Sequence, residues 1–114
     1  MSAPPPGVPL CRFDELADPG ARGFCYQIGD DLFRGFVVRR GKEVFGWLDR
    51  CPHLGLPLTL GDDRYLAEGG EHILCCSHGA LFQPEDGLCI AGPCEGRGLG
   101  AWPVRRWNDL VVTA

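Results

Sequence analysis

Short stretches of apolar or alternating residues, broken by turn residues, run through most of this chain. They are rich in Val, Ile, Phe, Tyr and Trp, which favour strands. They predict strands over residues 24–27, 33–40, 44–49, 73–76, 80–83, 88–91, 102–107 and 110–113. Only residues 13–18 and 62–66 suit a turn of helix, and neither segment is long enough for an independent helix. The pattern therefore predicts an all-β fold, a small antiparallel sandwich or barrel.

The composition narrows this picture to one small domain. The chain has 114 residues with 17 glycines and 10 prolines, so tight turns are frequent and long helices are disfavoured. Hydrophobic residues make up 45% of the chain, which is enough for a modest core. Residues 1–9 are rich in proline and are predicted to form a flexible arm. Residues 10–114 are predicted to form a single domain.

Charge and targeting signals argue against several classes of function. The formal net charge is −4, so the chain lacks the basic surplus that binding to nucleic acid requires. No apolar run approaches the roughly 20 residues of a membrane span. The first residues lack the features of a signal peptide, so the expected location is the reducing cytoplasm. The 7 cysteines, an odd number, are therefore expected to be ligands or buried thiols rather than a disulfide framework.

Two short motifs combine cysteine with histidine. The first is Cys51-Pro-His53-Leu-Gly and the second is Cys75-Cys-Ser-His78-Gly. A single zinc ion is one candidate for such a set, but structural zinc sites usually take two cysteines from one turn and two histidines from another. Because each motif here is mixed, the spacing suits a centre of two metals, with the cysteines on one metal and the histidines on the other.

The motifs resemble the two ligand boxes, CPHLG and CxxHG, of the Rieske [2Fe–2S] ferredoxin family. The segment FGWLDR before the first box also fits that family, and Gly92-Pro93 resembles its proline loop, which covers the cluster from a third side. The resemblance covers roughly residues 24–114. It implies a Rieske-type β fold with a subdomain of cluster-binding loops at about 51–58, 75–82 and 92–94.

The same resemblance implies one [2Fe–2S] cluster per chain, with Cys51 and Cys75 on one iron and His53 and His78 on the other. The second box leaves one ambiguity at the level of the residues. Cys76 also precedes His78, at a spacing that mirrors the first box, and strand geometry would place both on one face. The family pattern selects Cys75 as the ligand, with Cys76 as a nearby thiol.

Residues around the boxes indicate a low reduction potential. High-potential members of the family carry a disulfide between the ligand loops and Ser and Tyr hydroxyl groups that donate to the cluster. The corresponding positions here hold Leu56, Ser77, Ala80 and Phe82, so these devices are missing. Since Rieske centres span roughly −150 to +300 mV, the lower end of that range is expected.

The resemblance implies a soluble one-electron carrier, the ferredoxin component of an oxygenase or a related oxidoreductase system. Its partners would be a reductase that donates electrons and an oxygenase-like acceptor, with no nucleic acid, membrane or small-molecule substrate. It is not expected to be catalytic alone, because a mononuclear iron site needs two histidines and a carboxylate, and only His72 remains after the cluster ligands. Leu54, Leu56, Leu58 and Pro93 are candidates for an apolar rim around the contact surface.

Two alternatives stay open. One is a structural or sensory module that contains zinc or a cluster, and the other is a non-catalytic Rieske subunit of a larger oxidoreductase. Cys89 and Cys94 could form a second metal pair, but no further ligand box lies nearby, so small buried thiols are expected. Cys11 and Cys25 are expected to pack within or beside strands.

Overall fold

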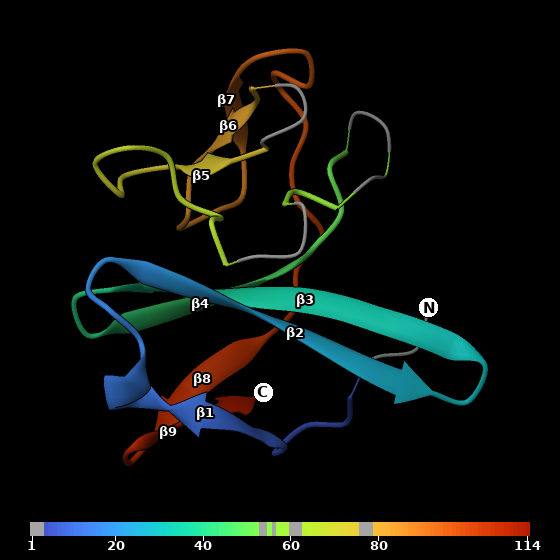
Figure 1. The fold of residues 1–114 in the computed structure, drawn as a ribbon, viewed down its shortest axis with the longest axis vertical. Helices are drawn as coiled ribbons and strands as arrows, with labels where there is room; N and C mark the ends of the chain where they lie inside the picture. Colours follow the sequence, from blue (N-terminus) through green and yellow to red (C-terminus); the bar gives the residue numbers. More distant parts are fainter. Residues whose placement is uncertain (1–3, 53–54, 56, 60–62, 76–78) are drawn as a thin grey trace.

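Three antiparallel sheets, each of three strands, build the fold (Figure 1). The computed structural model describes residues 4–52, 55, 57–59, 63–75 and 79–114. The elements in these residues are β1 (Pro9–Arg12), η1 (Phe13–Glu15), β2 (Gly20–Ile28), β3 (Asp31–Arg40), β4 (Glu43–Leu48), β5 (Ile73–Leu74), β6 (Leu81–Phe82), β7 (Cys89–Ala91), β8 (Val104–Trp107) and β9 (Leu110–Thr113). The sheets have the orders β1-β9-β8, β2-β3-β4 and β5-β6-β7. In Figure 1 the sheet β2-β3-β4 lies between the other two.

Strand β3 contributes to two hydrophobic cores, one on each of its faces. Phe33 and Val37 pack with Trp102 in the core shared with β1, β8 and β9. Phe36 and Val38 pack in the second core, which extends to β5, β6 and the loops around them. Successive strand residues point to opposite faces, so an almost continuous apolar run suits a strand that is covered on both sides. Burying each of these side chains contributes about 1.5–3 kcal/mol.

The N-terminal segment runs along the last strand. The Gly7 N–H donates to the Thr113 carbonyl over 2.8 Å, and the Thr113 N–H donates to the Val8 carbonyl over 2.9 Å. The Thr113 hydroxyl accepts from the Val8 N–H and donates to the Pro5 carbonyl, both over 2.7 Å. The prediction of a flexible arm over residues 1–9 therefore does not describe residues 5–9, because local composition does not reveal a partner at the other end of the chain. Residues 1–3 lie outside the described residues.

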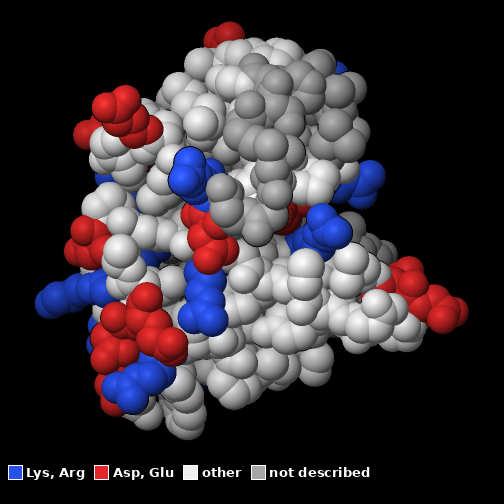
Figure 2. Space-filling view, in the orientation of Figure 1, with Lys and Arg blue, Asp and Glu red and all other residues white. Residues whose placement is uncertain are grey.

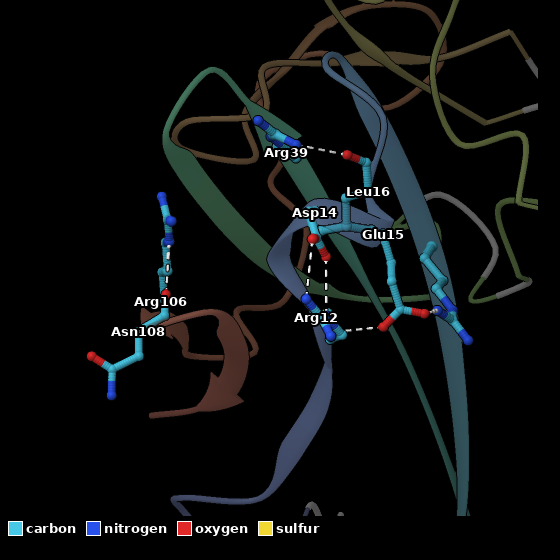
Figure 3. A network of polar contacts seen from close by, with 8 residues as sticks. Arg12, Asp14, Glu15, Leu16, Arg39, Arg106 and Asn108 are labelled. Carbon is cyan, nitrogen blue, oxygen red and sulfur yellow. Dashed lines mark hydrogen bonds and ion pairs between the residues drawn. The ribbon is translucent and has the colours of Figure 1, made fainter.

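The short helix η1 connects the sheet that contains β1 to the end of β3 (Figure 3). The carbonyl of Leu16, which follows η1, accepts a hydrogen bond from the Arg39 guanidinium over 2.8 Å. The guanidinium groups of Arg39 and Arg106 lie over the Phe13 ring, at 4.1 and 3.8 Å from its centroid. Arg39, at this end of β3, therefore has a packing role, because its charge faces an aromatic ring.

The sheet β5-β6-β7 is small and is surrounded by long loops that return to β4. The Trp47 indole donates to the Pro84 carbonyl over 3.0 Å. The Leu48 N–H donates to the Gly100 carbonyl over 2.8 Å, and the Trp102 N–H donates to the Gly46 carbonyl over 3.1 Å. The loops between β4 and β8 are thus anchored on the rigid middle sheet, which is the usual place for a functional site on a β scaffold.

The prediction of an all-β fold with antiparallel sheets is confirmed. Each predicted strand corresponds to an observed one, although β5, β6 and β7 are shorter than predicted and β2 is longer. The predicted turn of helix at residues 13–18 is the three-residue η1. The second one, at 62–66, is absent from its described part, residues 63–66, where Leu66 instead forms a β-bridge with Ile73. Strand β1 was not predicted, because its hydrogen-bond partner β9 is distant in sequence.

The surface carries charges of both signs. In the face that Figure 2 shows, acidic and basic side chains are interspersed mainly along the left side of the molecule. One exposed pair joins Arg40 on β3 to Glu85 in the loop after β6. No helix in the part of the chain that the structure describes is long and apolar enough to cross a bilayer.

Candidate metal centre

The first ligand box begins in the loop after β4. Cys51 is fully buried, with 0% of its surface exposed. Its carbonyl accepts a hydrogen bond over 2.7 Å from the N–H of Gly55, which lies four positions later. Gly55 has φ +71, a left-handed conformation that is costly for residues with a side chain. The glycine of the motif therefore permits the backbone conformation at position 55 that this hydrogen bond accompanies.

The second box repeats this construction after β5. Cys75 is also 0% exposed. Its carbonyl accepts from the Gly79 N–H over 2.8 Å, and Gly79 has the same φ of +71 as Gly55. The Cys75 N–H donates to the Ala80 carbonyl over 2.9 Å, which holds both ends of the turn together. Cys51 and Cys75 thus occupy equivalent positions in two matching turns.

The third loop, which follows β7, meets both ligand loops. A Cβ atom on Gly92 would lie 2.8 Å from the Cα of Ala80, so only a glycine can approach the second loop this closely. The buried Cys94 side chain lies in the same apolar cluster as Cys51. The Arg97 guanidinium donates to the Pro52 carbonyl over 3.4 Å. The three predicted loops therefore converge in the structure.

The two cysteines lie in an apolar environment. They belong to one buried cluster that also contains Leu58, Ala80 and Phe82, each of which is 0% exposed. The expected apolar rim is therefore wrong for Leu58, whose side chain is part of the core, while Pro93 is exposed. Leu54 and Leu56 lie outside the described residues.

A carboxylate braces the first ligand loop. Asp49 Oδ1 accepts a hydrogen bond from the Leu58 N–H over 2.7 Å, and its Oδ2 accepts one from the Tyr65 hydroxyl over 2.9 Å. The Tyr65 ring stacks on Phe36 of β3, with 4.3 Å between the ring centroids and 4° between the planes. Burial, followed by the nearby charge and hydrogen bond of Asp49, raises the pKa of Tyr65 above its usual range. The residues on either side of the loop are thus tied to the middle sheet.

The other cysteines differ in exposure. Cys89 and Cys94 are buried, as predicted, and their Sγ atoms are 3.2 Å apart. Burial, and then the contacts with Cys89 and Cys51, raise the pKa of Cys94 to about 12, so its thiol is neutral near pH 7. Cys11 is buried between sheets, but the prediction is wrong for Cys25, which is exposed on β2.

Two of the four predicted ligands can be placed. The structure brings Cys51 and Cys75 into one buried cluster. His53, His78 and the competing residue Cys76 lie outside the described residues. The donors that can be examined fit an iron–sulfur cluster, since soft thiolates in an apolar and dry environment are its preferred ligands.

Sequence reasoning missed the role of two residues near this site, Asp49 and Cys94, the second of which shares a buried cluster with Cys51. The signal for the matched turns was present, because Cys51 and Cys75 each precede a glycine by the same four positions. The role of Asp49 had no comparable signal, since both of its hydrogen-bond partners come from later in the chain.

Comparison with known proteins places this geometry in a family. A sequence model of the Rieske [2Fe-2S] domain matches residues 7–108. Oxidoreductase NdmD of Pseudomonas putida is 32% identical over 78 residues, and the match covers 62% of this chain and only 12% of the length of that protein.

Two solved structures share the fold over most of the chain. A ferredoxin from Sphingomonas yanoikuyae B1 is 25% identical with a TM-score of 0.69, covering 93% of this chain and 95% of that one. A chain in the complex of reduced oxygenase and oxidized ferredoxin in carbazole 1,9a-dioxygenase is 23% identical with a TM-score of 0.73, covering 94% and 91%. The chain therefore belongs to the Rieske [2Fe-2S] domain family, and its cofactor is a [2Fe–2S] cluster.

Proposed function

We propose that this chain is a one-electron carrier, the ferredoxin component of an oxygenase or a related oxidoreductase system. Its ligands would be Cys51, His53, Cys75 and His78. The observation that carries this proposal is the convergence of three loops on two fully buried cysteines in matching turns. The [2Fe–2S] cluster supplies one-electron chemistry when it is bound. The chain itself supplies a rigid and dry environment for that chemistry.

The loop tips favour electron exchange at the surface. Gly55, Gly79 and Pro93 are exposed, although each belongs to a loop that carries or contacts a buried cysteine. The centre is therefore deep enough to exclude water but separated from the surface by only one loop. A carrier needs this arrangement, since its contacts with redox partners are small and transient, typically below about 1,200 Å² of buried surface.

The same loops support a low reduction potential. Ala80 and Phe82, which occupy the places of hydroxyl donors in high-potential relatives, are both fully buried. Two apolar side chains in place of hydroxyl donors disfavour the extra negative charge of the reduced state. We therefore place this chain at the lower end of the Rieske range. A midpoint well above zero millivolts in a spectroelectrochemical titration contradicts this placement.

The names of the relatives support the choice of partners. One similar structure comes from a complex of an oxygenase with a ferredoxin, and the similar protein from Pseudomonas putida is an oxidoreductase. The donor would be a flavin-containing or iron–sulfur reductase, and the acceptor an oxygenase. We place the chain in the cytoplasm, where reduced thiols remain available as ligands.

A reconstituted electron-transfer assay tests the carrier function. The chain, loaded anaerobically with iron and sulfide, is mixed with NADH, a flavin-dependent ferredoxin reductase and cytochrome c as a one-electron acceptor. A rate of cytochrome c reduction that rises with the concentration of the chain supports the proposal. The matched control is Cys51→Ser, for which the rate should fall to the background of the reductase alone. A wild-type rate equal to that background overturns the proposal, and binding of one zinc ion favours the structural alternative.

One observation favours a second candidate, a Rieske segment that acts within a larger oxidoreductase. The related protein from Pseudomonas putida matches this chain over only 12% of its own length. In that case the chain would form a stable complex with a reductase or oxygenase subunit. Co-expression with neighbouring redox genes followed by gel filtration distinguishes the two, since a free carrier elutes as a small protein.

A further inference from the structure

A groove of about 380 Å³ lies beside the first ligand loop, between that loop and the start of β3. Gly55 of the first box lines one part of the groove, and Arg34 and Arg50 line another. Leu32 and Leu48 supply apolar surface, and the Leu32 side chain is 50% exposed. The groove therefore combines exposed apolar surface with two arginines, next to a loop that carries a buried cysteine.

Both guanidinium groups are available to a partner, because Arg34 and Arg50 are exposed. Within the part of the chain that the structure describes, neither side chain makes a hydrogen bond or an ion pair. Asp49 is the one carboxylate among the described residues that line the groove. Its two oxygens already accept hydrogen bonds from Leu58 and Tyr65. The two arginines are thus not paired within the groove.

The backbone fixes both arginines relative to the ligand loop. The Asp49 N–H donates to the Arg34 carbonyl over 3.1 Å, which ties the segment that carries Arg50 to β3. A Cβ atom on Gly55 would lie only 3.2 Å from Arg50 Nε, so the head group of this arginine lies against the ligand loop. The groove therefore presents its positive charge at the edge of the loop that holds the first buried cysteine.

The sign of this charge selects the partner. The whole chain has a formal net charge of −4, so a groove with two unpaired arginines differs from the average of the chain. Charges of one sign at a docking edge steer an oppositely charged protein into one orientation and raise its association rate. Guanidinium groups suit carboxylates in particular, because their N–H groups form paired hydrogen bonds with both carboxylate oxygens. Arginine is also enriched in protein interfaces.

We propose that the groove defined by Leu32, Arg34 and Arg50 is the docking surface for an acidic face of the redox partner, whose carboxylates pair with the two arginines. The inference rests on the proposed function, in which Cys51 is a cluster ligand. A partner in the groove contacts Gly55 and so lies one loop away from the buried Cys51. One electron then passes from the reduced centre to the oxidised partner.

Two one-electron acceptors of opposite charge test this surface. Plastocyanin is an acidic copper protein, and cytochrome c is a basic haem protein. The loaded chain is reduced with dithionite, freed of excess reductant and mixed with each acceptor in a stopped-flow instrument. One electron takes copper from Cu(II) to Cu(I) in plastocyanin, or iron from Fe(III) to Fe(II) in cytochrome c. Binding of the oxidised chain to immobilised plastocyanin is measured separately, so docking has a readout apart from electron transfer.

The groove variant is Arg34→Glu combined with Arg50→Glu. The matched control is Lys42→Glu combined with Arg105→Glu, which changes the net charge equally at exposed positions outside the groove. At low ionic strength, the groove variant should lose about tenfold in rate and affinity with plastocyanin but keep its rate with cytochrome c. The control should lose much less. Binding of the wild type to plastocyanin should weaken as salt is added, because salt screens exposed charges.

The outcomes separate the two proposals. If the wild type transfers electrons to neither acceptor, the carrier function is overturned, and the binding measurement alone decides on the groove. Equal losses in the groove variant and the control, or equal losses with both acceptors, overturn only the docking surface. Wild-type binding to plastocyanin that does not weaken with salt overturns it as well. If the groove variant does not retain iron and sulfide, Arg34→Gln with Arg50→Gln takes its place under the same criteria.

Discussion

The Tyr65 hydroxyl donates a hydrogen bond to the Asp49 carboxylate over 2.9 Å, and Asp49 lies two residues before the first buried cysteine of the site. The same carboxylate accepts from the backbone of Leu58 at the other end of the ligand loop. One side chain therefore holds both ends of this loop and connects them to the stacked pair of Tyr65 and Phe36 on the middle sheet. The loop is positioned by the core and not only by its own sequence.

Removing this carboxylate should destabilise the protein. Asp49→Ala leaves the Leu58 N–H and the Tyr65 hydroxyl without an acceptor, so we expect a loss of about 2–4 kcal/mol in the free energy of unfolding. Tyr65→Phe keeps the aromatic stack and should cost only about 1 kcal/mol. Asp30→Ala, at the exposed turn between β2 and β3, is the control and should change stability by less than about 0.5 kcal/mol. Urea unfolding measures all three, and equal losses for Asp49→Ala and Asp30→Ala would contradict the bracing role.

The hydroxyl of Tyr65 also predicts a dependence of stability on pH. Its pKa is raised in the folded state, so the unfolded chain releases this proton at a lower pH than the folded chain does. The stabilisation that the protonated Tyr65 hydroxyl gives to the folded state is fully present below the unfolded pKa of about 10. It is lost as the pH rises above that value. The free energy of unfolding should therefore fall more steeply above pH 10 in the wild type than in Tyr65→Phe. If the free energy of unfolding, measured with urea, falls with pH equally steeply in both proteins, the role of the Tyr65 hydroxyl is contradicted.

The matched turns predict a matched response to substitution. Gly55 and Gly79 both have φ +71, so Gly55→Ala and Gly79→Ala should each cost about 1–2 kcal/mol and reduce iron retention by displacing the preceding cysteine. Gly96→Ala is the control, because Gly96 has φ +86 and open space within 4 Å of where a Cβ atom would lie, but belongs to neither box. It should lose similar stability and keep normal iron content. Iron loss that is equal in all three variants would count against the turns.

The two adjacent cysteines of the second box should behave differently. Cys75 is buried in a turn equivalent to that of Cys51, which supports its assignment as the ligand, whereas Cys76 lies outside the described residues. We expect Cys51→Ser and Cys75→Ser to lose the cluster and Cys76→Ser to retain it. Cys25→Ser, at an exposed position on β2, is the control. The iron and sulfide content of each variant measures cluster retention. If Cys76→Ser loses the cluster and Cys75→Ser retains it, Cys76 is the ligand instead of Cys75.

Local sequence patterns were sufficient to predict the strands whose pairing partners lie nearby in the sequence. The run from Phe33 to Val38 was predicted as a strand from its β-branched and aromatic residues, and it forms the centre of both cores. The pairing of residues 5–12 with β9 was not predicted, because it joins the two ends of the chain. The proline-rich composition predicted a flexible arm, but backbone hydrogen bonds to Thr113 hold residues 7 and 8 of this segment against β9.

The same distinction holds at the site. Cys51 and Cys75 were identified because their motifs are local and specific. Leu58 was assigned to the surface although it is fully buried, since its neighbours come from other loops. The burial of Cys94 in the same cluster as Cys51 likewise depends on how two loops meet, which spacing along the chain does not encode.

Electron paramagnetic resonance of the dithionite-reduced protein, combined with iron and sulfide analysis of the same sample, tests the central claim most directly. The account predicts about two irons and two sulfides per chain and a rhombic signal with an average g value below that of a cluster bound by four cysteines. A colourless protein after anaerobic loading, or one that holds a single zinc ion and gives no signal, would contradict it.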